Sequence, residues 1–379
     1  MKETKTLHIR YHGRKVGTIA LDKRNLAAFQ YDKEWLADGF SISPFSLPLE
    51  PCVFLPKPDP FDGLFGVFAD SLPDGWGRLL VDRLMLRNHL NPYEIGNIDR
   101  LAIVGGSGMG ALCYEPEYHF DTGNISIDLD EISRECQKIL NTDTTDKNKL
   151  DDLFRLGGSS GGARPKILTK IDGEDWIIKF PASADHGDVG RQEYLYSLCA
   201  KECGIEMAET RLFPSKVCGG YFGTKRFDRR KKEDGSIERV HMLSASAILE
   251  TSHRIPNLDY EILMKLTLEL TKDYTELEKL YRLMCFNVFA HNRDDHSKNF
   301  TYLYEENEGR WILSPAYDLT YSYSIGGEHA TTVHGNGRNP GLGDILKVAE
   351  SIGMDYGTAK GIAEDIYECV KERLKEYLR

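Results

Sequence analysis

The sequence lacks any uninterrupted apolar run long enough to span a bilayer. The segment from Met1 to Lys5 also lacks the apolar core of a signal peptide, so we expect a cytoplasmic protein that does not associate with membranes. None of the eight cysteines belongs to a Cys-x-x-Cys pair. Cys199 and Cys203 are one helical turn apart, which favours packing over metal binding, and we expect reduced thiols throughout.

Positive charge is also scarce. The sequence has 48 Lys and Arg residues against 59 Asp and Glu residues, which gives a net charge of -11. A protein that binds DNA or RNA directly needs a basic face, so we expect no direct nucleic-acid binding by this chain alone. The composition is otherwise globular, with 41% hydrophobic and 28% charged residues. A length of 379 residues predicts two or three domains.

Local patterns predict a β-rich beginning and a helical end. A hairpin is expected over residues 8–19 with His12-Gly13 at its turn, and a second over 166–180 with Asp172-Gly173 at its turn. A polar stretch at 141–149 indicates a domain boundary. The pattern becomes helical from about residue 242. Helices are expected over 260–269, 275–289, 344–352 and 358–378.

A dense polar cluster lies between an apolar helical run and a strand-like segment that begins at Phe300. Asp294 and Asn299 have the Asp-x-x-x-x-Asn spacing of protein kinases, in which the Asp takes the substrate hydroxyl proton and the Asn holds a metal. Asp318 follows where a kinase keeps its metal-binding Asp. The alternative is a helix end followed by a polar turn whose acids only act as caps.

The oxygen ligands offered by Asn299 and Asp318 are hard donors, which suit Mg²⁺. Arg293 could keep Asp294 ionised, since a neighbouring cation favours the carboxylate. His296 and Lys298 could contact phosphate, although His296 could equally be a structural histidine. A zinc site is a poor fit here because no further His or Cys with metal-ligand spacing lies nearby.

A Gly-rich segment, Gly157 to Gly162, precedes the strand that begins at Lys166. Its backbone amides could approach phosphate oxygens, although Gly-Lys-Ser/Thr is absent and the segment could be a flexible linker. Lys179 ends the next strand and could reach a phosphate or pair with Glu193, or it could point to water from an edge strand. The segment Gly105 to Gly110 is expected to be a flexible turn.

Arg226-Phe227-Asp228 ends the last strand before the helical part. In a bilobal kinase this position receives the adenine, so the backbone of Arg226 and Phe227 could bind the base and Asp228 could accept from ribose hydroxyls. The alternative is a charged strand end without a ligand.

Together these motifs resemble those of the HipA-like bacterial toxin serine/threonine kinases. The resemblance rests on segments that keep one order along most of the chain: Asp70 to Gly75, Gly157 to Lys166, Ile178 to Pro181, Lys225 to Arg229, Arg293 to Asn299, and Pro315 to Asp318. It implies an α+β, bilobal protein-kinase-like fold. The implied parts are an N-terminal β-rich subdomain over 1–120, a nucleotide-binding lobe with the Gly-rich loop over 121–230, and an all-helical C-terminal lobe over 231–379.

The resemblance also implies Mg-ATP as the phosphate donor, Asp294 as the base and Mg²⁺ on Asn299 and Asp318. It implies autophosphorylation of Ser159 or Ser160. Nucleotide contacts are implied for one set of residues: Gly161, Gly162, Ala163, Arg164, Lys166, Lys179, Arg226, Phe227, Asp228, His296, Lys298 and Asn299.

The partners implied are a small DNA-binding, HipB-like antitoxin and a protein substrate, of which aminoacyl-tRNA synthetases are known examples in the family. Arg164-Pro165 departs from members that have Gln and an acid before the loop lysine, which leaves the loop contacts open. The alternative functions are a kinase of a small molecule or lipid, and a non-catalytic ATP-binding regulator that acts with a DNA-binding partner.

Overall fold

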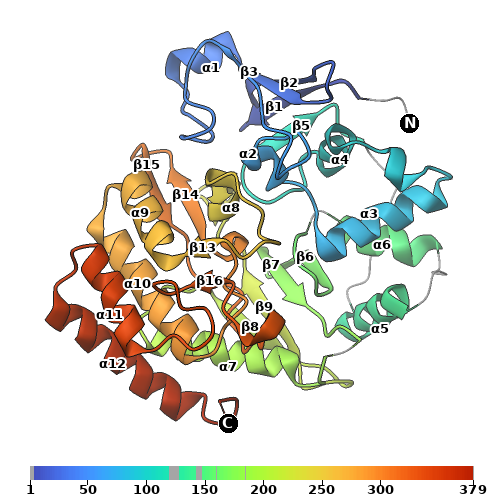
Figure 1. Ribbon diagram of the computed structural model, residues 1–379. Helices are drawn as coiled ribbons and strands as arrows, with labels where there is room; N and C mark the ends of the chain where they lie inside the picture. Colours follow the sequence, from blue (N-terminus) through green and yellow to red (C-terminus); the bar gives the residue numbers. More distant parts are fainter. Residues whose placement is uncertain (1–3, 119–127, 142–146, 159, 184, 379) are drawn as a thin grey trace. The chain divides into compact units, whose positions relative to one another are not determined.

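The computed structural model describes residues 4–118, 128–141, 147–158, 160–183 and 185–378, and it has a mixed α/β fold (Figure 1). The chain divides into two compact units. The first comprises Met1–Gly190, Leu212–Leu243 and Ala247–Thr251, and the second comprises Arg191–Arg211, Ser244–Ser246 and Ser252–Arg379. Within the described ranges, every helix is too short or too polar to cross a bilayer.

The first unit contains a five-stranded antiparallel sheet that begins with the predicted hairpin. His12 and Gly13 have φ values of 47° and 80°, the left-handed conformation that a two-residue hairpin turn requires. This confirms the first hairpin. The strand order across the sheet is β4 (Val53–Phe54), β3 (Ala27–Tyr31), β2 (Arg14–Leu21), β1 (Thr6–Tyr11) and β5 (Leu112–Glu115).

A four-stranded sheet forms the other half of the first unit. The second predicted hairpin is confirmed here, with φ values of 54° at Asp172 and 79° at Gly173. The order is β6 (Lys166–Ile171), β7 (Glu174–Lys179), β9 (Tyr221–Lys225) and β8 (Thr210–Phe213), and the first two residues of β8 belong to the second unit.

Three helices share a hydrophobic core with this sheet: α3 (Gly75–Arg87), α5 (Leu129–Asn141) and α6 (Lys147–Gly157). Trp76 from α3 and Trp176 from β7 are both buried in it. The polar pattern near 147 gave no indication of α6, which forms because Leu150 and Leu153 bury one face in the same core. Residues 142–146, at the centre of the predicted boundary, lie outside the described residues.

The remaining elements of the first unit are short connections around these sheets. They are α1 (Lys33–Asp38), α2 (Gly66–Ala69), η1 (Pro92–Glu94), α4 (Asn97–Val104), β10 (Arg229–Lys231) and β11 (Ile237–Arg239). Three further elements continue from one unit into the other: α7 (Val189–Glu202), β12 (Met242–Ser244) and α8 (Ala245–Ile248).

The second unit is built on four helices: α9 (Tyr260–Thr271), α10 (Tyr274–Phe289), α11 (Leu342–Ser351) and α12 (Tyr356–Arg373). All four confirm predicted helices, and α10 runs beside α12 (Figure 1). The starts of α9 and α10 are set by Asp259 and Asp273, whose carboxylates accept from the backbone N–H of Glu261 and Thr275.

The expectation of an all-helical C-terminal lobe is wrong. Residues 301–313 form an antiparallel hairpin of β14 (Thr301–Glu305) and β15 (Arg310–Leu313). Aromatic and β-branched residues favour a strand here, and Gly309 supplies a φ of 62° at the turn. The shorter elements of this unit are β13 (Leu258–Asp259), β16 (Thr331–Thr332), η2 (Ser297–Asn299) and η3 (Ile325–Gly327).

Candidate active site

The Gly-rich loop of the first unit lies against the start of α3. Gly162 has a φ of 85°, which favours glycine; its N–H donates to the carboxylate of Asp74, and its carbonyl accepts from the N–H of Trp76 over 2.9 Å. A Cβ atom at Gly75 or Gly77 would collide with backbone carbonyls of this loop. Glycine in both segments therefore allows the loop to dock at the N-terminus of α3.

The two predicted phosphorylation sites lie in this loop. Ser160 is only 2% exposed, and its hydroxyl donates to the carbonyl of Gly157 over 2.5 Å. Ser159 lies outside the described residues. Gly161 and Ala163 are exposed on the same segment, and the carbonyl of Gly161 accepts from Lys166 Nζ over 2.5 Å. The loop thus presents exposed backbone beside a lysine while it holds Ser160 inside.

Lys166 and Lys179 lie directly opposite each other in the β6–β7 register. Residues directly opposite each other in an antiparallel pair lie on the same face, so both lysine side chains belong to one face of the hairpin at its open end. Lys179 Nζ also lies 5.6 Å from the ring centre of Phe222. Glu193, the predicted partner of Lys179, is 2% exposed on α7 and belongs to the second unit, so that pairing remains a prediction.

Arg164 is held by an acid of its own unit. Its Nε and one terminal nitrogen donate to the two carboxylate oxygens of Asp185 over 3.1 and 3.2 Å. Asp185 also accepts from the N–H of Ala182 over 2.8 Å. This two-point geometry fixes the guanidinium beside the loop.

Arg226 and Asp228 belong to a buried charge network at the end of the strand. Asp228 is 0% exposed and accepts from Arg226, from Arg229 and from the N–H of Gly110. Burial would raise the pKa of Asp228, but the two guanidinium groups outweigh it and lower that pKa to about 2. The carbonyl of Gly108 accepts from both arginines, so the segment expected to be a flexible turn is held in place. Contact between Asp228 and a ribose would require this network to open.

The second unit carries the Asp294 to Asn299 loop, which begins where α10 ends. His291 has a φ of 53°, which turns the chain away from the helix. Asn292 donates its side-chain amide to Asn287 over 2.9 Å, and Asn287 donates to the hydroxyl of Tyr260 over 3.0 Å. Burial, followed by the charge of Arg293, lowers the pKa of His291. The buried amides anchor the first half of the loop to α9 and α10.

Asp294 and Asn299 are brought together as their spacing predicts. Asp294 is exposed, and Asn299 Nδ2 donates to its backbone carbonyl over 2.7 Å. Tyr317 joins this loop to the segment that carries Asp318, because its hydroxyl donates to the carbonyl of Lys298 over 2.5 Å and lies 2.6 Å from Thr301 Oγ1. Asp318 itself has a φ of 58°.

Asp295 is the main residue of this loop that sequence reasoning missed. It is 1% exposed, and its carboxylate accepts from Tyr260 over 2.8 Å and from the N–H of Thr331 over 3.2 Å, and lies 2.9 Å from His329 Nδ1. Burial, followed by the Asp295 charge, raises the pKa of Tyr260 well above its usual value, so the phenol stays a donor. The sequence feature that could have indicated this role is the pair of adjacent acids. Asp294 is exposed, while Asp295 is buried and holds the loop.

Several polar atoms of the same loop are buried without a hydrogen-bond partner among the described residues. They are Arg293 Nε, His296 Nδ1 and Ser297 Oγ. Buried polar groups in native proteins are nearly always paired, so such a cluster marks a place where a ligand or water completes the structure. The His296 ring lies 5.4 Å from that of His253.

The donor set of the loop fits Mg²⁺. Since the amide nitrogen of Asn299 is engaged with Asp294, the atom it offers to a cation is Oδ1. Asp318 offers a carboxylate, which is the other kind of ligand that this hard cation takes from proteins. Asn299 and Asp318 are therefore the residues that would hold the ion.

The fold and these motifs define a HipA-like protein. Residues 158–374 match the sequence model of the HipA-like C-terminal domain, and residues 7–115 match that of the HipA N-terminal domain. The chain belongs to the HipA-like family, which confirms the resemblance drawn from the sequence.

Two relatives illustrate the similarity. A protein of Sinorhizobium fredii (strain NBRC 101917 / NGR234) named "Putative kinase Y4mE" is 27% identical over 345 residues, which cover 83% of this chain and 77% of that protein. The solved structure of Shewanella oneidensis MR-1 HipA, in a toxin–antitoxin complex with HipB and operator DNA, superposes with a TM-score of 0.72 at 16% identity. That match covers 98% of this chain and 90% of the other. At this identity the likeness shows a shared fold.

Proposed function

We propose that this chain is an ATP-dependent protein serine/threonine kinase and the toxin of a toxin–antitoxin pair. The observation that carries the proposal is the loop in which Asp294 is exposed while Asn299 is bound to its backbone carbonyl. A kinase loop needs this combination of a carboxylate open to substrate and an amide held in place next to it. Membership of the HipA-like family and the kinase name of a relative support the same reading.

The phosphates of ATP are assigned to the first unit. Lys166 and Lys179 offer two positive charges at the end of the β6–β7 hairpin, beside the exposed backbone of the Gly-rich loop. Arg164 borders the loop, and backbone groups of Arg226 and Phe227 are assigned to the base. Phosphoryl transfer needs gripped phosphates and neutralised charge more than covalent work by the protein.

Asp294 is assigned to the reacting hydroxyl. Its carboxylate takes the proton while the hydroxyl oxygen forms a bond to the γ-phosphorus, and the bond from that phosphorus to the bridging oxygen breaks with its electron pair on ADP. Bound Mg²⁺ supplies neutralisation of phosphate charge. The residues of this chain that would hold it are Asn299 and Asp318, and His296 and Lys298 are assigned to phosphate contacts.

Self-modification is assigned to Ser159 or Ser160 through the chain's own Asp294. Ser160 is buried and donates to Gly157, so the loop must leave α3 before this hydroxyl can react. A phosphate would add about -1.5 to -2 charge. That charge would compete with ATP for Lys166 and Lys179, so phosphorylation lowers ATP affinity.

The partner is assigned as a small, basic, DNA-binding antitoxin of the HipB type. A net charge of -11 disfavours direct operator contact by this chain alone. The Shewanella oneidensis structure contains HipA, HipB and operator DNA together, which supports the same arrangement here. The phosphorylated substrate is assigned to the protein class, with an aminoacyl-tRNA synthetase as the example taken from the family.

The test is transfer of labelled γ-phosphate into proteins of a host-cell lysate, followed by identification of the labelled residue. The parent should label a serine or threonine of a protein, and Asp294→Asn should not. Asp365→Asn is the matched control, because Asp365 is an exposed acid of the same unit on α12. Label confined to lipid or small molecules would favour the small-molecule or lipid kinase. ATP binding without any transfer would favour a regulator that acts with a DNA-binding partner.

A further inference from the structure

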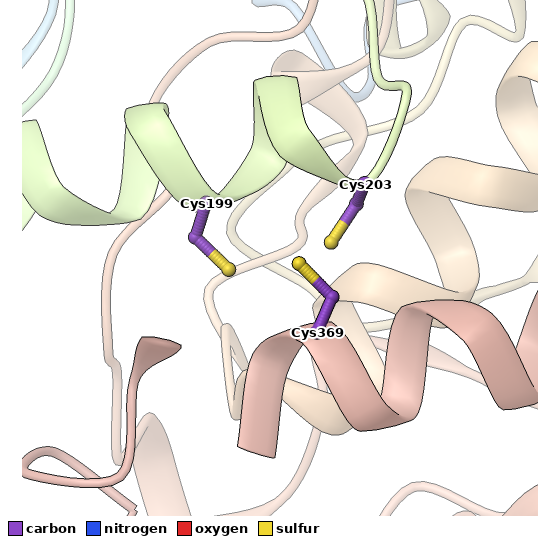
Figure 2. Close-up of side chains that lie close together, drawn as sticks. All are labelled: Cys199, Cys203 and Cys369. Atoms are coloured by element: carbon purple, nitrogen blue, oxygen red, sulfur yellow. The ribbon is translucent and has the colours of Figure 1, made fainter. Parts of the chain in front are cut away.

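Three thiols of the second unit point toward one another. Cys199 lies on α7, Cys203 directly follows the last residue of α7, and Cys369 lies on α12 (Figure 2). Their sulfur atoms are within 4.8 Å of one another. The N–H of Cys203 donates to the carbonyl of Cys199 over 2.9 Å, which continues the last helical turn, so the two residues lie one above the other on the same face. The spacing of these two residues alone favours packing. Cys369 comes from a distant part of the chain and adds a third thiol, so the three together could hold a metal ion.

The surroundings of the three thiols are partly closed. Cys199 and Cys203 are buried, while Cys369 is half-buried and is the most exposed of the three. Beside the cluster, Arg373 Nε of α12 donates to the Glu202 carboxylate of α7 over 2.5 Å, which joins the same two helices. Cys203 favours the Cys199 thiolate by hydrogen bonding, which lowers the pKa of Cys199. The same hydrogen bond, together with burial, raises the pKa of Cys203.

We propose that Cys199, Cys203 and Cys369 form a zinc site, with a water molecule as the fourth ligand on the side of Cys369. Thiolates select thiophilic d¹⁰ ions, and zinc in an open site takes three protein ligands and a water. Tetrahedral zinc with Zn–S bonds of about 2.3 Å places its sulfurs about 3.8 Å apart, so the observed cluster needs only a small contraction.

Charge favours the divalent ion over a monovalent one. Three thiolates around Zn²⁺ leave a single negative charge, whereas Cu(I) would leave two in a partly buried place. The nearby Glu202–Arg373 pair is neutral as a whole and does not offset the second charge. Binding replaces the thiol protons by the metal, so it releases protons and weakens as the pH falls.

The site would tie the helix that supports the candidate catalytic loop to the last helix of the chain. Tyr196, one turn before Cys199 on α7, donates its hydroxyl to the carbonyl of Ala290 over 2.9 Å, at the start of that loop. The Tyr196 ring also lies 5.9 Å from the ring of Tyr377, beyond α12. Zinc at the cysteines would therefore stabilise the second unit and hold α7 against this loop.

The test uses the full chain, reduced and freed of metal with a chelator. Titration with Zn²⁺ against a chromophoric competitor should show one equivalent bound, with a rise in Tm. Co²⁺ as a spectroscopic substitute should give thiolate-to-metal absorption and the intense visible bands of a tetrahedral ion. Cys199→Ser, Cys203→Ser and Cys369→Ser should each lower zinc affinity at least about a hundredfold. Cys285→Ser is the matched control, a buried cysteine of α10 outside the cluster, and should bind like the parent.

A second measurement needs no variant and covers the case in which a serine variant fails to fold. Zinc should protect Cys199, Cys203 and Cys369 of the parent from alkylation, as mapped by peptide mass spectrometry, and should leave Cys52 as reactive as before. The proposal is overturned by the absence of stoichiometric zinc binding or by equal protection of all cysteines. Binding of Cu(I) but not of Zn²⁺, or a disulfide that forms in the cluster and excludes metal, would also overturn it.

Discussion

Asn299 donates its side-chain amide to the backbone carbonyl of Asp294 over 2.7 Å, so the two ends of the predicted catalytic loop hold each other. Asn299→Asp separates this contact from metal binding, because aspartate keeps an oxygen ligand but cannot donate. We expect Asn299→Asp to bind Mg-ATP and to lose phosphate transfer at least about a hundredfold, since a small displacement of the base is enough for that loss. Steady-state transfer rates and Mg-ATP titrations measure the two effects separately.

Asn299→Ala is the companion variant, because it removes both the donor and the ligand. It should lose Mg-ATP affinity as well as transfer. If Asn299→Asp transfers phosphate at the parent rate, the contact with Asp294 has no part in positioning the base.

Asp294 and Asp295 are adjacent acids with opposite environments. Substitution of Asp294 should therefore affect phosphate transfer, and substitution of Asp295 should affect stability. Asp294 is exposed, and Asp294→Ala should abolish transfer while leaving Tm within a degree or two of the parent. Asp295 is buried and accepts from Tyr260 and Thr331. Asp295→Ala leaves these donors unsatisfied and should lower the free energy of unfolding by about 3 kcal/mol. Chemical denaturation and transfer assays on both variants check the prediction.

The pair serves as its own control, because each variant removes one carboxylate from neighbouring positions. Equal loss of stability in the two variants would mean that Asp294 is also structural. Full stability in Asp295→Ala would mean that the buried network around Tyr260 is not needed to hold the loop.

Short-range chemistry explains the parts of the fold that could be predicted. Both hairpins needed only residues able to adopt a positive φ at the turn, which His12-Gly13 and Asp172-Gly173 supply. The expectation of an all-helical lobe was wrong because the aromatic and β-branched residues after Phe300 pair as the β14–β15 hairpin between the helices. Helix α6 was missed because its stability comes from a core supplied by α3, α5 and β7.

The candidate site was predictable where spacing along the chain is also spacing in space, as for Asp294 and Asn299. It was not predictable where distant segments meet. The N–H of Gly162 donates to the carboxylate of Asp74, and the N–H of Gly110 donates to the carboxylate of Asp228. The partners in each bond are far apart in the sequence. A composition pattern carries no record of such partners, so the burial of Asp228 could not be predicted from the sequence.

The docked Gly-rich loop gives a prediction about nucleotide affinity that rests on the proposed function. The carboxylate of Asp74 accepts from the N–H of Gly162, a backbone donor of the kind that would bind a phosphate oxygen. Asp74→Ala removes both the competing acceptor and a negative charge near the loop. We expect ATP to bind about tenfold more tightly, which corresponds to one hydrogen bond of about 1.4 kcal/mol. Calorimetric titration with Mg-ATP measures the change.

Asp234→Ala is the charge-matched control, because Asp234 lies in an exposed turn of the same unit. It should bind ATP as the parent does. Unchanged or weaker binding by Asp74→Ala would show that the contact supports the loop instead of competing with nucleotide.

His241 should make the first unit sensitive to mild acid. It is 1% exposed, its Nε2 donates to the carbonyl of Ile42 over 2.9 Å, and the rings of Tyr11 and Phe40 lie around it. Asp70 lines the same small cavity. Burial lowers the pKa of His241 from 6.5 to about 4, against the opposing effect of the Ile42 carbonyl.

Since the folded pKa is the lower one, the unfolded chain binds the proton first as the pH falls. The contribution of neutral His241 to stability is therefore complete above pH 6.5, decreases between 6.5 and 4, and is lost below 4, by about 3 kcal/mol in total. Urea unfolding at a series of pH values should show this slope in the parent. His241→Gln keeps an N–H donor but does not titrate, so its slope should be shallower by that amount. His89→Asn, at an exposed site with a φ of 57°, should keep the parent slope. Parallel curves for the parent and His241→Gln would refute the assignment.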